Sequence, residues 1–164
     1  MKICVLGDIH NKNLPDKLIE KIKSSDLVIG TGDFAEINIV KKIEKLSKKF
    51  IAVYGNLDSE EVRKVLPEVR VFEITKRKVG LYHGNGSPLW IEKRVLARLR
   101  KESKEHFDII FFGHSHHATN KIIDKTLFFN PGSPTDIIFA PYKSFGIVEI
   151  NKKTGKIKAR IVRV

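Results

Sequence analysis

The sequence predicts an α/β protein in which two β-sheets pack face to face with helices outside. In residues 1–56, apolar strand patterns alternate with amphipathic helix patterns, which is the order of a parallel sheet with right-handed crossovers. In the second half, short strand patterns follow one another closely, which is typical of antiparallel pairs. The 164 residues are enough to bury a substantial core, and no linker or repeat divides them. We therefore expect a single domain over residues 1–164.

The first half is expected to contain three buried strands separated by two helices. Continuous apolar runs such as KICVLG indicate strands covered on both faces. Apolar residues at spacings of three and four indicate helices with one buried face. The expected strands are residues 2–7, 26–32 and 50–56, and the expected helices are residues 14–25 and 36–49.

The second half contains mostly strand patterns. Two of them are predicted to be adjacent around Lys76 and Arg77, and the last two flank NKKTG, a hairpin with a glycine near its tip. The expected elements are a short helix at 60–66, a long basic helix at 89–106, and strands at 69–74, 78–84, 108–114, 121–124, 126–132, 144–150 and 155–162.

The composition is that of a soluble globular protein. No apolar run approaches the roughly 20 residues of a membrane span, and the N-terminus does not have the pattern of a signal peptide, so a cytoplasmic location is expected. Cys4 lies in an apolar run and is predicted to be a buried, inert thiol. The formal charge of +12 is spread along the chain, which favours a solvated basic surface over a nucleic-acid interface.

Residues able to bind a metal recur after five predicted strands. In open α/β sheets, ligands bind beyond the carboxyl ends of the strands, so these loops can converge. A lone Asp-x-His or Gly-Asp is usually a turn or a helix cap, but five such strand ends in one chain are hard to attribute to turns. The residues are Asp8 and His10 in GDIH, Asp33 in GTGD, Asn56 and Asp58 in GNLD, His83 in YHG, and His114, His116 and His117 in GHSHH.

Oxygen and imidazole ligands without thiolate suit Mn²⁺, Fe²⁺, Zn²⁺ or Ni²⁺, and there are too many of them for one ion. Two ions about 3.5–4 Å apart form the arrangement that catalyses in-line displacement at phosphorus. The residues thus predict phosphoester hydrolysis at a dinuclear metal centre.

The order D-x-H, GD, GN-x-D, HG and GH-x-H over residues 8–116 resembles that of the calcineurin-like metallophosphoesterases. NPGS at 130–133 and the short length are similar to the small single-domain phosphodiesterases of archaea and bacteria. The resemblance implies a four-layer αββα sandwich, two divalent ions with Mn²⁺ favoured and Co²⁺ among the alternatives, and attack by a hydroxide that bridges the metals. It also implies ligand roles: Asp8, His10 and His116 for the first metal, Asn56, His83 and His114 for the second, and Asp33 as the bridge.

Three residues are expected to act in catalysis. These are Asn56 and His83, through the second metal, and Asp58, which either orients a ligand or serves the turn. Many family members have histidine in the middle of GN-x-D, where it is thought to help the leaving group. Leu57 occupies this position here and cannot donate a proton, so we expect phosphodiesters to be better substrates than monoesters.

Two other classes of function were considered. Ser115 in GHSHH could be a hydrolase nucleophile, but His117 replaces the closing glycine of the nucleophile elbow. A non-catalytic metal-binding scaffold is the stronger alternative, because a retromer subunit of this fold is thought to be an adaptor.

The expected substrate is a small phosphodiester, nucleotides included. Nucleic acid is less favoured, no membrane partner is expected, and homo-oligomerisation is left open. His106 matches no ligand motif and is predicted to lie at a helix end.

Overall fold

The computed structural model describes residues 1–10, 13–136 and 138–164 and contains two five-stranded sheets. In the first sheet, with strand order β10-β9-β1-β2-β3, the three strands of the first half are parallel. The last two strands of the chain pair antiparallel at its edge, with β9 next to β1. The strands are β1 (Lys2–Leu6), β2 (Leu27–Gly30), β3 (Phe50–Ala52), β9 (Ser144–Ile150) and β10 (Ile157–Arg163).

The second sheet has the order β4-β5-β6-β8-β7 and is also mixed. Its three central strands are parallel, and the two edge strands pair antiparallel with their neighbours. Its strands are β4 (Val69–Ile74), β5 (Arg77–Tyr82), β6 (Ile109–Phe111), β7 (Thr119–Ile123) and β8 (Thr126–Asn130).

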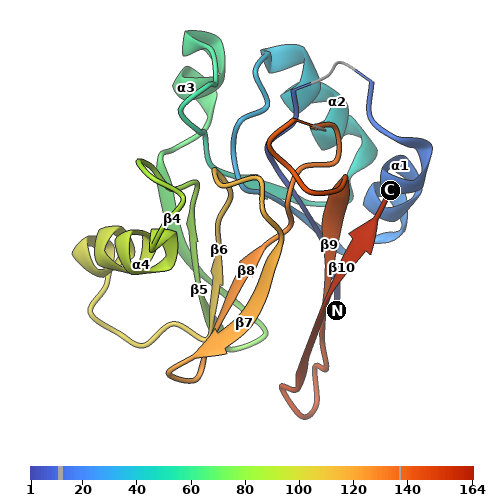
Figure 1. Cartoon of the computed structure of the whole chain (residues 1–164). Coiled ribbons are helices and arrows are strands. Elements are labelled where there is room, and N and C mark those ends of the chain that lie inside the picture. The colour runs from blue at the N-terminus through green and yellow to red at the C-terminus, as the bar shows by residue number, and fades with distance from the viewer. Residues whose placement is uncertain (11–12, 137) are drawn as a thin grey trace.

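Helices cover the outer faces of both sheets. α1 (Asp16–Ser24) and α2 (Ile37–Leu46) lie against the first sheet, and α4 (Ile91–Glu102) lies against the second (Figure 1). α3 (Glu60–Val65) follows β3 and packs its Val62 into the same core as α1 and α2. The predicted four-layer αββα sandwich is therefore confirmed.

Three apolar clusters separate the four layers. The cluster between the sheets brings Val5 and Ile29 of the first sheet against Leu81, Phe111 and Phe129 of the second. The other two clusters lie under the helices, as the predicted helix faces require. Cys4 is buried in the core under α1 and α2, as predicted, and burial raises the pKa of its thiol to about 12.

The long basic helix is shorter than predicted. Trp90 adopts left-handed dihedral angles (φ 59°, ψ 26°) and Ser103 is extended (φ −149°, ψ 133°), so only Ile91–Glu102 is helical. The interpretation of His106 as a helix-end histidine is therefore wrong, since it lies four residues beyond Glu102 and is exposed.

Strand boundaries at two hairpins differ from the prediction by one residue. Thr75 and Lys76 form the turn between β4 and β5, so Arg77 already belongs to β5. Asp124 and Lys125 form the turn between β7 and β8. All four turn residues have positive φ, and such two-residue turns match the twist of the strands even without the usual glycine or asparagine.

No helix in the described parts of the chain is both long enough and apolar enough to cross a bilayer.

Candidate metal centre

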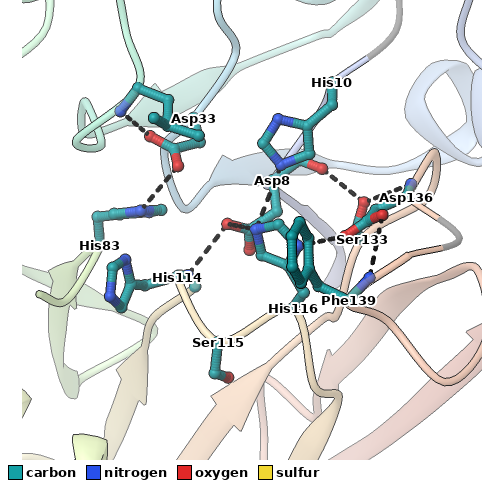
Figure 2. Close-up of polar contacts among 12 residues, drawn as sticks. Asp8, His10, Asp33, His83, His114, Ser115, His116, Ser133, Asp136 and Phe139 are labelled. Carbon is teal, nitrogen blue, oxygen red and sulfur yellow. Dashed lines mark hydrogen bonds and ion pairs between the residues drawn. The ribbon is translucent and has the colours of Figure 1, made fainter. Parts of the chain in front are cut away.

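The loops that follow five strands meet at one end of the two sheets. Asp8, Asp33 and Asn56 lie beyond β1, β2 and β3, and His83 and His114 lie beyond β5 and β6. Figure 2 shows the side chains from the two sheets facing one another across this region. The strands end earlier than the sequence predicts, because the chain leaves the ladder just before each of these residues.

Four of the predicted metal ligands have left-handed backbone conformations. Asp8, Asp33, His114 and His116 have φ values of 52°, 55°, 69° and 56°. Side chains other than glycine seldom adopt this conformation, and residues held in it cluster at functional sites. The conformation turns each side chain away from the direction that the strand would give it.

The imidazole of His83 is held with one nitrogen turned toward the site. Its Nδ1 lies 2.8 Å from the carbonyl oxygen of Thr31, which can only accept, so Nδ1 carries a proton. Its Nε2 lies 3.2 Å from both the Asp33 carboxylate and Oδ1 of Asn56. A neutral ring would direct a lone pair at two oxygens there, so either a proton on Nε2 or a bound metal ion is needed at this position. Burial opposes the charged ring, but the hydrogen bond to Asp33 and the negative charges of Asp8 and Asp33 together raise the pKa of His83 to about 8.

His114 repeats this arrangement on the neighbouring strand. Its Nε2 donates to the carbonyl oxygen of Gly86 at 2.7 Å, and its Nδ1 lies 2.7 Å from Oδ1 of Asn56. The Asn56 oxygen is thus shared by two imidazole nitrogens. A cation bound by Asn56, His83 and His114 would satisfy all three atoms.

His116 is anchored from the opposite side of the site. Its Nδ1 donates to the carboxylate of Asp136, and its Nε2 lies 3.2 Å from Nε2 of His10. The ring of Phe139 approaches it edge-on, with centroids 6.0 Å apart. Metal-bound histidines usually donate their second ring nitrogen to a carboxylate or a backbone carbonyl. His83, His114 and His116 each make a hydrogen bond of this kind.

The carboxylate of Asp8 lies at the centre of the arrangement. It is fully buried, and its Oδ1 accepts the backbone N–H of His114 at 3.1 Å. Its Oδ2 has no hydrogen-bond partner among the described residues. Buried polar atoms are normally paired, so this orphaned acceptor fits a missing cation. Without a cation, burial raises the pKa of Asp8 to about 6.

Two groups of ligand atoms come within 4.8 Å of one another in the described structure. The first is Asp8, His10 and His116, and the second is Asp8, Asp33 and His83. Asp8 is common to both, whereas Asp33 was predicted to bridge the two metals. Burial would raise the pKa of Asp33, but the hydrogen bonds from His83 and from the backbone of Leu57, together with the nearby imidazoles, lower it. Candidate carboxylate, imidazole and amide ligands without thiolate fit divalent first-row ions.

Asp58 contacts the backbone of the site loops rather than the ligand side chains. Its carboxylate accepts the backbone N–H groups of Asp33, Phe34, Ala35 and Gly55 at 2.6–2.9 Å. It therefore joins the loop after β2 to the loop after β3. These contacts fit both predicted roles of Asp58, orienting ligands and stabilising the turn, since the loops that it joins carry two predicted ligands.

Three polar contacts of the site lie outside the predicted residues. Asp136 binds His116, Ser133 donates to the backbone carbonyl of Asp8, and Thr135 accepts the backbone N–H of His10. Ser133 is the last residue of the NPGS motif and the other two follow it, but nothing in the sequence pattern marks Asp136 as a partner of His116. His117 lies beside the site, with Nε2 3.1 Å from the carbonyl oxygen of Phe139.

Ser115 does not have the surroundings of a nucleophile. Its side chain points away from the histidines in Figure 2, and its Oγ accepts a hydrogen bond from Asn130 at 3.0 Å. A serine nucleophile needs a base within hydrogen-bond reach, and no histidine hydrogen-bonds to Ser115 in the described part of the chain.

The fold and the site together define an α/β protein with candidate metal ligands at the carboxyl ends of its strands. Residues 1–153 match the calcineurin-like phosphoesterase superfamily domain, and the chain belongs to this superfamily.

Similar proteins include a phosphodiesterase, a probable metallophosphoesterase and Vps29. Phosphodiesterase MJ0936 of Methanocaldococcus jannaschii is 27% identical, over 93% of this chain and 95% of that protein. A probable metallophosphoesterase of Methanothermobacter thermautotrophicus is 29% identical, over 82% of this chain and 78% of its own. The crystal structure of Vps29 complexed with Zn²⁺, from Entamoeba histolytica, superposes with a TM-score of 0.76 at 25% identity, over 99% of both chains.

Proposed function

We propose that this protein is a metal-dependent phosphodiesterase with a dinuclear centre. The observation that carries the proposal is the set of anchored imidazoles. His83, His114 and His116 each bind an acceptor through one ring nitrogen and present the other to a common region that also contains Asp8 and Asp33. The similarity to a phosphodiesterase over nearly the whole of both chains supports the same activity.

The ligand assignment is part of the proposal. Asp8, His10 and His116 would bind one ion, and Asn56, His83 and His114 the other, with Asp33 between them. Two divalent ions there, Mn²⁺ in the favoured case, would act as Lewis acids on the phosphoryl oxygens and make a water a better nucleophile.

The protein's own groups would orient the ester. The amide of Asn56 has two N–H groups, one of which can donate to a phosphoryl oxygen while Oδ1 faces the ligands. Asp58 fixes the loop that presents Asn56. Leu57 is 57% exposed beside it and has no proton to give, so the leaving oxygen must take its proton from water. Good leaving groups, such as those of activated diesters, tolerate this best.

The test is hydrolysis of bis-p-nitrophenyl phosphate and p-nitrophenyl phosphate, with and without Mn²⁺. We expect Mn²⁺-dependent turnover that is faster for the diester. The variant His116→Gln should lose most of this activity, whereas the control His106→Gln, at an exposed histidine outside the site, should keep it. Turnover of both esters that is independent of metal, or an active His116→Gln, would contradict the proposal.

A non-catalytic metal-binding scaffold is the second candidate, favoured by the likeness to Vps29 with bound Zn²⁺. Metal binding alone therefore does not separate the two functions. Metal analysis combined with the ester assay does: a protein that binds two equivalents of metal but turns over neither ester would be a scaffold.

A further inference from the structure

A second pocket opens directly beside the metal centre. It has a volume of about 200 Å³ and shares Asn56 and His83 with the site. Its remaining walls include the side chains of Tyr54, Arg63 and Tyr82. A substrate with its phosphate at the metal centre could therefore place an attached group in this pocket.

One wall of the pocket is a planar cation on an aromatic ring. The guanidinium of Arg63 lies over the Tyr54 ring, 5.0 Å from its centroid. Its Nε donates to the carbonyl oxygen of Asp58, and its Nη2 donates to those of Gly55 and Asn56. These bonds fix the plane of the guanidinium, so this wall is preorganised for a flat ligand.

The other walls provide polar groups that can form hydrogen bonds with a ligand. Tyr82 lines the pocket, and its hydroxyl can both donate and accept a hydrogen bond. Oε2 of Glu68 accepts a hydrogen bond from Nη2 of Arg98 at 3.0 Å, which leaves Oε1 able to accept one from a ligand. Asn85 is exposed at the rim and can both donate and accept.

We infer that this pocket binds the nucleobase of a nucleoside phosphodiester. The inference rests on the proposed phosphodiesterase function and adds the class of substrate. Single bases are recognised by stacking on aromatic rings and guanidinium planes and by hydrogen bonds to their edges, which are the groups present here. The pocket is smaller than the 300–1,000 Å³ typical of drug-sized ligands, so it suits one ring system.

The polar groups also indicate which bases fit best. A carboxylate only accepts hydrogen bonds, so Glu68 favours a base edge with N–H donors. Guanine offers an amino group and a ring N–H side by side, whereas thymine offers a single ring N–H. The expected order of preference is therefore guanosine before thymidine.

The test compares esters that share one leaving group. The p-nitrophenyl esters of guanosine 5′-phosphate, thymidine 5′-phosphate and methyl phosphate all release p-nitrophenolate, so ratios of kcat/KM isolate the nucleoside. With Mn²⁺, we expect the guanosine ester to exceed the methyl ester about tenfold or more, mainly through KM. Tyr54→Leu should bring this ratio close to one, and Tyr54→Phe, which keeps the ring, should preserve it.

The chain offers a matched control for the aromatic wall. Tyr142 is also half-buried and lies under an arginine, with Arg163 4.2 Å from its ring centroid, but it does not line the pocket. Tyr142→Leu should keep the wild-type ratio. Glu68→Gln should narrow the preference for guanosine over thymidine several-fold. A wild-type ratio of one, or an unchanged ratio in Tyr54→Leu, would overturn the inference.

Failure of the proposed function would look different. If no ester is hydrolysed, titration of the protein with guanosine 5′-monophosphate, followed by NMR, still tests the pocket. Base binding by a non-catalytic protein would be supported by NMR shifts of pocket residues in the wild type and by an affinity about tenfold weaker in Tyr54→Leu. Absence of binding by the wild type would overturn it.

Discussion

The carboxylate of Asp58 accepts the backbone N–H of Asp33 at 2.9 Å, so one buried aspartate positions another. Asp58 is 5% exposed and receives three further backbone N–H groups. In turn, Oδ1 of Asp33 accepts the backbone N–H of Leu57 at 2.7 Å. The loops after β2 and β3 are thus bound to each other in both directions, which holds Asp33 and Asn56 near His83.

Replacing Asp58 by alanine is expected to weaken both the fold and the metal centre. Three buried amide groups and the part-buried one of Ala35 would lose their acceptor, and each unsatisfied buried donor costs about 1–3 kcal/mol before water and relaxation compensate part of it. We expect a loss of about 2–4 kcal/mol in the free energy of unfolding, measured by urea denaturation with EDTA. Asp124→Ala, in an exposed hairpin turn, is the control. A loss below about 1 kcal/mol would show that the four bonds contribute little.

The contact between Asp136 and His116 predicts a selective effect on metal binding. Asp136→Asn keeps Oδ1, which accepts the backbone N–H of Ile138, but replaces the oxygen that binds His116. Loss of such a partner typically lowers metal affinity about 10–100-fold. Competition for Mn²⁺ with a chelating dye should show this decrease, while the melting temperature with EDTA changes little. Equal Mn²⁺ affinity in the two proteins would mean that Asp136 only shapes its loop.

The strand ends could be predicted from the sequence because the information is local. A buried parallel strand is a short apolar run, and the polar residue that follows it must lie at the carboxyl edge of the sheet. Asp8, Asp33 and Asn56 were found in this way. Asp136 and His116 are 20 residues apart in the sequence, and Asp136 lies in a loop without periodicity, so no sequence pattern predicts their contact. The backbone acceptors of His83 and His114 could not be predicted either, because every residue has a carbonyl oxygen and the sequence does not mark which one accepts.

The misplaced elements have equally local causes. Residues 103–106 continue the basic, polar character of α4, and composition does not reveal that Ser103 turns extended. The turn at Thr75 and Lys76 adopts positive φ without glycine or asparagine, because the pairing of β4 with β5 imposes it. At this turn, strand pairing overrides the preference of single residues.

Gly113 is expected to tolerate no side chain. A Cβ added there would lie 2.8 Å from Oδ2 of Asp8, 3.0 Å from Oγ1 of Thr31 and 3.1 Å from Nδ1 of His83. Gly113→Ala should therefore displace two predicted ligands at once and cost about 1–3 kcal/mol of stability through overpacking. We expect Mn²⁺-dependent stabilisation in thermal melts to disappear. A Gly113→Ala protein with an unchanged Mn²⁺-dependent melting temperature would show that the strand end can shift to make room.

Leu57 provides the sharpest test of substrate preference. Its backbone N–H is bound to Asp33, while its side chain is 57% exposed next to Asn56, so a histidine there could reach the leaving oxygen of a bound ester. General acid catalysis typically contributes 10²–10⁴-fold, and a poor leaving group gains most from it. Leu57→His should therefore raise kcat/KM for an alkyl phosphomonoester by about tenfold or more and change that for bis-p-nitrophenyl phosphate little.

The control for this substitution is Val65→His. Val65 on α3 is 59% exposed, but it lies outside the metal centre, so a histidine there adds the same group without access to the substrate. The measurement is the ratio of monoesterase to diesterase kcat/KM with Mn²⁺ across the pH range 6–8. In Leu57→His, the monoesterase rate should fall as the new imidazole loses its proton, because only the protonated ring can act as an acid. An equal rise in Val65→His, or a ratio unchanged in Leu57→His, would mean that Leu57 does not determine which ester the site prefers.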